Sequence, residues 1–270
     1  MSGAQKSFSD VPAVILCGGR GTRFGSETEL KPKPMIDIGG RPILWHIMHH
    51  YARFGVRKFI LCLGFKGDII RDYFLDYWRI NRDMEVSLKA GDVRILDGAR
   101  TPEDWDVVLA ETGELTETGD RIAKVLERID GDQFFATYGD GVSSVDIASL
   151  HAQHTENGRL ATISAVRPSS RFGELDIKGN QILTFQEKPQ AQAGWINGGF
   201  MMFQKQAFAH LEDGANVSLE KGVLEVLAER EELSVYQHDG FWQCMDTARE
   251  RDLLNDMWES GNAPWQVIPK

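Results

Sequence analysis

The sequence has little of several features that define common protein classes. It contains three cysteines, Cys17, Cys62 and Cys244, which are too few for a disulfide framework and lack the spacing of a zinc site. It has no run of about 18 apolar residues, and residues 1–10 contain no apolar segment of the signal-peptide kind. We therefore expect a cytoplasmic protein with no membrane contact, in which Cys17 and Cys62 are small core residues.

Positive charge is also scarce. The 270 residues include 30 lysines and arginines against 40 acidic residues, which gives a net charge of −10. Such an acidic protein is a poor partner for nucleic acid. With 42% hydrophobic residues, the chain is long enough to bury one large α/β core. We predict a single domain over residues 13–270, preceded by an extension of residues 1–12.

The cations that are present gather close to the N-terminus. Residues 13–17 (AVILC) have the length and composition of a strand buried on both faces. Glycines then allow backbone N–H groups to approach a ligand closely. Together with the cations they indicate a phosphate-binding loop, although a glycine turn beside a solvated basic face is the alternative. The glycines are Gly18, Gly19 and Gly21, and the cations are Arg20, Arg23, Lys31 and Lys33.

Two familiar phosphate loops do not fit this stretch. A dinucleotide fingerprint starting at Gly19 would need glycine at its sixth position, where the chain has Phe24. The Walker A string, which ends in Gly-Lys-Ser/Thr, is absent from the sequence. The loop must therefore belong to another class of nucleotide-binding protein, if it binds a nucleotide.

Strand and helix patterns alternate along the chain. Residues 42–52 predict a helix that ends at Gly55, and residues 58–64 predict a second buried strand. Residues 133–138 and 160–166 predict further strands. This order indicates a mainly parallel sheet flanked by helices. Between about residues 79 and 121 apolar and polar residues alternate, around both Val86 and Val107, which predicts an inserted β-ribbon.

Short polar signals mark the ends of several elements. Asp68 could cap one helix, and Ser143 with Asp146 could form a capping box for another. A third signal, Thr247 with Glu250, predicts a capping box for the last helix. Residues 175–177 and 182–185 predict a hairpin that turns at residues 179–180. A helix is also expected from Ser218 to about residue 230.

Two aspartates are candidate magnesium ligands. Asp140 follows the strand of residues 133–138, whose carboxyl end should share a crevice with the glycine loop. Asp246 lies in the string CMDT. Mg²⁺ usually takes one or two carboxylates plus substrate phosphates. Separately, Asp140 could equally be a turn residue and Asp246 a helix cap. Lys33, held between Pro32 and Pro34, is the best single candidate for a phosphate contact.

Histidine and tryptophan offer weaker signals. His46 and His50 are one helical turn apart, as are His151 and His154, but no third zinc ligand accompanies either pair. Trp242, close to Asp246, could stack on a ligand or simply belong to the core. We therefore expect no zinc site, and leave the role of Trp242 open.

The motifs as a set are far more specific than any one of them. The chain resembles the sugar-nucleotide pyrophosphorylases, a nucleotidyltransferase family, and most of all those members that transfer a cytidylyl group to glucose 1-phosphate. The resemblance covers nearly the whole chain. It is based on the strings GGRGTRF, KPKPM, IGGRPILWHIM, TYGDGV, RFGELDI, FQEKP and INGGF.

The resemblance implies a Rossmann-like fold and a role for each motif. The loop and its neighbours would bind the nucleotide, and Arg23, Lys33 and Asp140 would be catalytic. Asp140 and Asp246 would hold Mg²⁺. In the cytidylyl-transferring members, a hydroxyl residue and an arginine from the ribbon, matching Thr116 and Arg121 here, lie near a nucleotide in an adjoining subunit. The implied nucleotide-binding residues are Leu16, Gly18, Gly19, Arg20, Gly21, Thr22, Arg23, Lys33, Thr116, Arg121 and Gly139, and the implied sugar-phosphate residues are Gly173, Glu187, Lys188, Asn197 and Gly198.

The implied reaction is the magnesium-dependent transfer of a cytidylyl group from CTP to α-D-glucose 1-phosphate, giving CDP-glucose and pyrophosphate for surface-polysaccharide synthesis. No residue identifies cytosine by its chemistry, so UTP or dTTP, or another sugar 1-phosphate, remains an alternative. A catalytically silent regulatory subunit is a further alternative, which the joint presence of Arg23, Lys33, Asp140 and Asp246 disfavours. The resemblance also implies a homo-oligomer, with a hexamer as the expected form.

Overall fold

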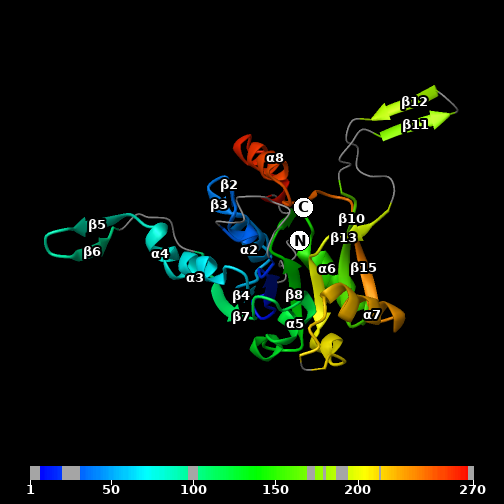
Figure 1. The fold of residues 1–270 in the computed structure, drawn as a ribbon, viewed down its shortest axis with the longest axis horizontal. Helices are drawn as coiled ribbons and strands as arrows, with labels where there is room; N and C mark the ends of the chain where they lie inside the picture. The colour runs from blue at the N-terminus through cyan, green and yellow to red at the C-terminus, as the bar shows by residue number, and fades with distance from the viewer. Residues whose placement is uncertain are drawn as a thin grey trace, which may run out of the picture.

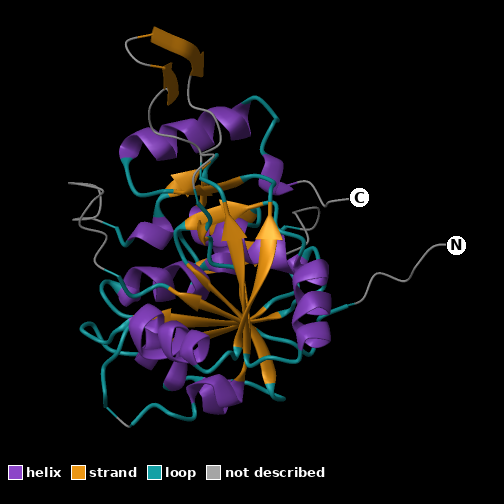
Figure 2. Cartoon of the chain, turned by 90° about the vertical axis from the view of Figure 1, so that its right-hand side faces the viewer, coloured by secondary structure: helices purple, strands orange, loops and turns teal. Residues whose placement is uncertain are grey.

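A mixed sheet lies at the centre of the protein, with helices on both sides of it (Figure 1; Figure 2). The computed structural model describes residues 7–19, 31–96, 103–168, 174–178, 181–186, 194–212 and 214–266. Within these residues the strand order is β13-β10-β14-β8-β1-β4-β7, and β15 also pairs with β10. The strands are β1 Ala13–Leu16, β4 Lys58–Leu63, β7 Asp106–Glu111, β8 Gln133–Tyr138, β10 Ala161–Val166, β13 Ile196–Asn197, β14 Met201–Gln204 and β15 Leu233–His238.

The part of the sheet around β1 is parallel, as the sequence predicts. Strand β1 pairs in parallel with both β4 and β8, and β4 pairs in parallel with β7. Strand β14 runs antiparallel to β8 and β10. Because β1, β4 and β8 point the same way, their carboxyl ends meet at one edge of the sheet, where an open α/β fold binds its ligands.

Strand β1 is buried on both faces because its side chains enter two different cores. Ala13 and Ile15 pack into one hydrophobic cluster together with residues of the helices α2 (Ile43–Ala52) and α6 (Ile147–Asn157). Val14 and Leu16 pack into the other cluster, with residues of α5 (Thr118–Ala123), η5 (Leu219–Leu224) and α7 (Glu225–Glu229). Successive strand residues point to opposite faces, so an apolar run without alternation is what such a strand requires. Cys17 and Cys62 are buried core residues, as expected.

Helices cover the sheet as the alternating pattern predicts. The helix over residues 42–52 is confirmed, with Pro42 as its N-cap and Gly55, at φ 94°, just beyond its end. The α-helices are α2 Ile43–Ala52, α3 Gly67–Leu75, α4 Tyr77–Ile80, α5 Thr118–Ala123, α6 Ile147–Asn157, α7 Glu225–Glu229 and α8 Ala248–Glu259. Shorter helices are η2 Lys33–Met35, η3 Leu126–Arg128, η4 Lys205–Phe208, η6 Pro264–Gln266 and the π-helix η5 Leu219–Leu224.

Four small two-stranded sheets complete the described fold. Two of them, β5–β6 and β11–β12, project from the body as hairpins on different sides (Figure 1). The hairpin expected over residues 175–185 is confirmed, although its turn at residues 179–180 lies outside the described residues. The pairs are β2 Asp37–Ile38 with β3 Arg41–Pro42, β5 Met84–Ser87 with β6 Asp92–Ile95, β9 Gly141–Ser143 with β16 Trp242–Cys244, and β11 Glu174–Lys178 with β12 Gln181–Gln186.

The predicted ribbon over residues 79–121 is too long. Only β5 and β6 form a projecting ribbon, whereas β7 is a strand of the main sheet, paired in parallel with β4. Its position at the end of the strand order leaves β7 only partly covered: residues 107–109 are half-buried and Ala110 is buried, whereas Asp106 and Glu111 at its ends are exposed. Residues 107–110 are a continuous apolar run, which belongs to a main-sheet strand and not to a ribbon that alternates between apolar and polar residues.

Two of the predicted caps are also corrected. Lys66, at φ 53°, is the residue before α3, and Asp68 lies in the first turn of that helix. Asp146 alone caps α6, accepting a hydrogen bond from the Ser149 N–H, whereas Ser143 belongs to β9. The helix expected from Ser218 begins there, with π-helical first turns. None of the described helices has the length and apolar character needed to cross a membrane.

Candidate active site

The described part of the glycine loop lies where three parallel strands end. The backbone N–H of Cys17 donates to the Cys62 carbonyl over 3.1 Å, and that of Gly139 donates to the Leu16 carbonyl over 3.0 Å. A side chain at Gly18 would collide with the guanidinium of Arg121, 2.2 Å from its ideal Cβ position. A larger residue at position 18 would therefore have to displace the Arg121 guanidinium from its hydrogen bonds. Arg20, Gly21, Thr22 and Arg23 lie outside the described residues.

A cavity of about 370 Å³ opens at this edge of the sheet. Its size lies within the range of small-molecule sites. The cavity brings together the start of the glycine loop, Lys33, Asp140 and the segment that leads into α5, which are far apart in the sequence. Its lining consists of Leu16, Cys17, Gly18, Gly19, Lys33, Pro34, Glu114, Leu115, Thr116, Glu117, Thr118, Arg121, Tyr138, Gly139 and Asp140.

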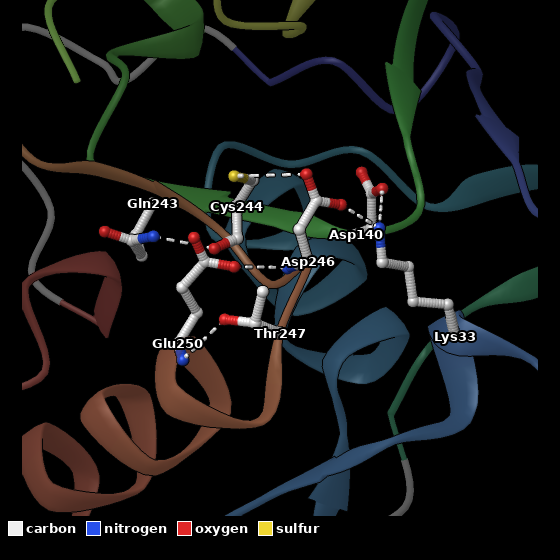
Figure 3. A network of polar contacts seen from close by, with 7 residues as sticks. All are labelled: Lys33, Asp140, Gln243, Cys244, Asp246, Thr247 and Glu250. Carbon is white, nitrogen blue, oxygen red and sulfur yellow. Dashed lines mark hydrogen bonds and ion pairs between the residues drawn. The ribbon is translucent and has the colours of Figure 1, made fainter. Parts of the chain in front are cut away.

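One ammonium group faces both candidate metal carboxylates. The Nζ of Lys33 lies 2.9 Å from Oδ2 of Asp140 and also forms an ion pair with Asp246 (Figure 3). Burial by itself lowers the pKa of Lys33, but the charge of Asp140, with a contribution from Asp246, outweighs it, so that the pKa lies above its usual value. Lys33 is therefore a buried cation that pairs with two carboxylates. Asp140 and Asp246 lie more than 100 positions apart in the sequence.

Strand pairing brings the two carboxylates together. Asp140 directly precedes β9, and β9 pairs antiparallel with β16, whose chain continues to Asp246. The Met245 N–H donates to the Asp140 carbonyl over 2.8 Å, which closes this pairing next to both side chains. Both aspartates therefore have fixed positions at the same edge, and neither is merely a turn or cap residue.

The start of α8 holds Asp246 from its other side. The Thr247 hydroxyl caps α8, accepting from the Glu250 N–H over 3.3 Å, as the predicted capping box requires. The Glu250 carboxylate accepts from the N–H of Asp246 over 2.7 Å, instead of from the cap residue itself (Figure 3). The cap therefore fixes the backbone of the candidate metal ligand as well as the helix.

Arg121 and Thr116 line the same cavity of the same chain. The Arg121 guanidinium is buried and donates to the carbonyls of Leu63, Gly18 and Glu114 over 3.0–3.2 Å, and to the Thr112 hydroxyl over 2.7 Å. The interpretation of both as ribbon residues is wrong, because Thr116 and Arg121 follow β7 and lie on the body of the molecule. Whether they also meet a nucleotide of an adjoining subunit stays a prediction.

Asn197 and Gly198, which are expected to bind the sugar, are not part of the cavity lining. Asn197 ends β13, and Gly198 follows it, with no room for a side chain because Val166 occupies the position of its Cβ. The Asn197 amide donates to the hydroxyl of Tyr138, which lines the cavity. Gly173, Glu187 and Lys188 lie outside the described residues.

Sequence reasoning missed Tyr138. Its hydroxyl donates to Glu220 over 2.6 Å, and burial together with this carboxylate raises the pKa of the phenol. Tyr138 is the last residue of β8, two positions before Asp140. That place at the carboxyl end of a buried parallel strand was a usable signal, because ligands bind at such ends.

The histidines do not form a metal site within the described residues, which contain no group of three or more potential ligands. His46 Nε2 donates to the Ile38 carbonyl and His50 Nε2 to the Val145 carbonyl. His154 pairs with the Thr162 hydroxyl. Burial lowers the pKa of each of these three rings to about 4. They are neutral, hydrogen-bonded core residues.

The described start of a glycine loop and two carboxylates meet at the carboxyl ends of parallel strands, which is the arrangement of an α/β protein that binds a ligand at this edge. The sequence matches the Nucleotidyl transferase family over residues 12–257, and the chain belongs to that family. It is 42% identical to the glucose-1-phosphate cytidylyltransferase of Salmonella typhimurium, over 94% of this chain and 98% of the other. It is 41% identical to a probable glucose-1-phosphate cytidylyltransferase of Bacillus subtilis, over 94% and 99% of the two chains.

Solved structures share the fold. HddC from Yersinia pseudotuberculosis superposes with a TM-score of 0.67, at 23% identity, over 92% of this chain and 99% of the other. A putative glucose-1-phosphate thymidylyltransferase from Bacillus anthracis superposes with a TM-score of 0.66, at 15% identity, over 96% and 98%. These likenesses confirm the predicted Rossmann-like architecture.

Proposed function

We propose that this protein transfers a cytidylyl group from CTP to α-D-glucose 1-phosphate, giving CDP-glucose and pyrophosphate. The observation that supports this most is one cavity lined by the glycine loop, Lys33 and Asp140, with Asp246 paired to the same ammonium. The two cytidylyltransferases that it resembles at 41–42% identity support the choice of CTP and glucose.

The reaction requires positioning more than activation. An oxygen of the sugar phosphate is already a nucleophile; it forms a bond to the α-phosphorus of CTP while the bond from that phosphorus to the bridging oxygen breaks, and pyrophosphate leaves with the electron pair. The difficulty is to bring two polyanions together and to stabilise the charge on the departing group. Lys33 on η2, together with Arg20 and Arg23 of the glycine loop, would serve this purpose, and no serine, cysteine or general base is needed.

The two carboxylates fit a divalent cation. Asp140 and Asp246 already converge on a single cation, the Lys33 ammonium, so their charges and positions suit Mg²⁺ with phosphate oxygens as its remaining ligands. When bound, Mg²⁺ supplies charge neutralisation on the phosphates. Once Mg²⁺ takes its place at the two carboxylates, the Lys33 ammonium would be free to contact the phosphates, because Lys33 lines the same cavity.

The remaining assignments follow the motifs. Leu16, Gly18, Gly19 and Gly139 would contact the nucleotide through their backbone, together with Arg20, Gly21, Thr22 and Arg23, and Thr116 with Arg121 would shape the cavity around it. Asn197 and Gly198, with Gly173, Glu187 and Lys188, would bind the sugar 1-phosphate. The three cysteines are free thiols, which suits a reducing cytoplasm.

The hairpin β5–β6 is the expected contact between subunits of a homo-oligomer. It projects from the body (Figure 1), and an isolated two-stranded hairpin is marginally stable in water. Val86 and Val93 face each other across it with 53% and 59% of their surfaces exposed, and Leu88 at its turn is 93% exposed. A second copy of the chain that covers these side chains would stabilise the hairpin.

The decisive experiment measures pyrophosphate release from each of the four nucleoside triphosphates with several sugar 1-phosphates, with and without Mg²⁺. We expect turnover with CTP and glucose 1-phosphate, and loss of turnover without the metal. Turnover with UTP or dTTP alone would show that the base is wrong. No turnover with any pair would contradict catalysis itself and favour a silent subunit.

A further inference from the structure

The turn that follows β13 contains one residue in an unfavourable backbone conformation. Gly199 has φ 72° and the next residue, Phe200, has φ 45° although it has a bulky side chain. A bulky non-glycine residue is strained in this left-handed region. The turn also interrupts a strand, because β13 and β14 pair with successive parts of β10 on either side of residues 198–200. Contacts from outside the turn must therefore maintain it.

Several hydrogen bonds supply that support from the sheet. The Gly198 N–H donates to the Ser164 carbonyl over 2.9 Å, and the Phe200 N–H donates to the Thr137 hydroxyl over 3.2 Å. The Ser164 hydroxyl donates to the Phe200 carbonyl over 2.6 Å. These bonds fix both ends of the turn, but they leave the Gly198 carbonyl to another partner.

That partner is Trp242. Its indole Nε1 donates to the Gly198 carbonyl over 2.7 Å. Trp242 is the first residue of β16, which pairs with β9 next to Asp140 and continues to Asp246. A single side-chain hydrogen bond therefore connects the segment that bears the candidate metal carboxylates to the turn expected to bind the sugar.

Tyr138 holds the same turn from the side of the cavity. Its ring lies against Gly199, where a Cβ would be 3.1 Å from the ring carbon Cδ2. Its hydroxyl accepts from the Asn197 amide at 3.4 Å and donates to Glu220 over 2.6 Å. The Asn197 amide oxygen accepts from the Gly199 N–H over 3.0 Å. The amide orientation of Asn197 is therefore set by Tyr138 on one side and by the turn on the other.

We infer that Trp242 and Tyr138 are positioning residues for the sugar 1-phosphate, through the turn of residues 197–200. Trp242 sets the distance between the turn and the carboxylates of Asp140 and Asp246, and Tyr138 sets the direction in which Asn197 presents its amide. This inference depends on the proposed sugar 1-phosphate substrate. Neither side chain needs to touch the reacting atoms, but a small displacement of one reactant lowers the rate strongly.

The test uses Trp242→Phe and Tyr138→Phe, which keep the rings and remove only the polar atoms. We expect kcat/KM for glucose 1-phosphate to fall about tenfold in each, with KM for CTP within about twofold of wild type and a melting temperature no lower than that of the control variants described below. Glu220→Ala removes the acceptor of the Tyr138 hydroxyl and should also lower kcat/KM. Glu220→Gln keeps an acceptor and should retain most of the activity.

Two matched controls exist elsewhere in the chain. The Trp45 indole donates to Glu103, and the Tyr77 hydroxyl pairs with the same carboxylate. Trp45→Phe and Tyr77→Phe therefore remove the same kinds of hydrogen bond, and should leave kcat/KM for the sugar phosphate unchanged.

The outcomes separate this inference from the proposed function. If Trp242→Phe and Tyr138→Phe behave like their controls while the wild type is active, the positioning role is wrong. Equal losses for both substrates, with a lower melting temperature, would also contradict it, since they would indicate a purely structural role. Binding of glucose 1-phosphate measured by calorimetry gives a second readout. A wild type that neither binds nor converts any sugar 1-phosphate would overturn both proposals.

Discussion

At the scale of single residues, Lys33 shows how the site is balanced. Its side chain is only 11% exposed, and it faces Asp140 and Asp246 at the same time. Burying one cation between two anions is favourable only while all three are present, since removal of one partner leaves an uncompensated buried charge. Lys33 therefore contributes to the local structure as well as to the proposed chemistry.

Lys33→Met should lower kcat at least about 100-fold, because a positioned charge on the transferring phosphate is lost. The variant should still fold, because the methionine fills much of the same space, but with lower stability, because Asp140 and Asp246 lose the cation they share. Lys31→Met is the matched control, because Lys31 is exposed and forms only a 3.4 Å ion pair with Asp37. Steady-state pyrophosphate release measures both. A Lys33→Met enzyme with near wild-type kcat would contradict the assigned role.

At the scale of elements, the carboxyl ends of β1 and β8 and the strand pair β9–β16 make the site. Parallel pairing places the glycine loop beside Gly139, and antiparallel pairing places Asp246 beside Asp140. The hairpin β5–β6, in contrast, contributes no residue to the lining of this cavity, and it exposes apolar side chains.

If the hairpin β5–β6 forms the subunit contact, making it polar should dissociate the oligomer. Val86→Thr with Val93→Thr and Leu88→Gln keeps the β-branched pair but removes apolar surface. Light scattering coupled to size exclusion should then report a smaller mass than for the wild type. Leu253→Gln, at an exposed position of α8, is the control. An unchanged mass in the triple variant would place the contact elsewhere.

At the scale of the whole molecule, buried histidines make stability depend on pH. His46, His50 and His154 have pKa values lowered by burial from 6.5 to about 4. Below pH 6.5 the unfolded chain binds protons at these rings, whereas the folded chain binds them only near pH 4. Stability should therefore fall as the pH drops through this window, and recover above it.

Between pH 7 and pH 5, each of the three rings should lower the free energy of unfolding by ~2 kcal/mol. Urea titrations at the two pH values measure the loss. His50→Gln keeps a donor for the Val145 carbonyl and removes one titrating group, so its stability should depend less on pH. A wild-type urea midpoint that does not change between pH 7 and pH 5 would contradict this account.

The sequence by itself determined the parts of the fold that follow from local pattern. The apolar run of β1, the periodicity of α2 and the Thr247 cap of α8 each depend on neighbouring residues, so their signals are visible in a single stretch. The glycines after β1, Lys33 and the two aspartates could likewise be identified as candidates from residue type and place in the motifs.

Only the tertiary structure decided which of these residues meet. The ion pairs of Lys33 join residues more than 100 positions apart. The hydrogen bond from Trp242 to the Gly198 carbonyl depends on the pairing of β16 with β9. The prediction from sequence assigns residues 106–111 to a ribbon, whereas parallel pairing with β4 makes them the strand β7 of the main sheet. Local sequence fixes periodicity and conformational preference, whereas long-range pairing sets distances, and the chemistry of the site depends on those distances.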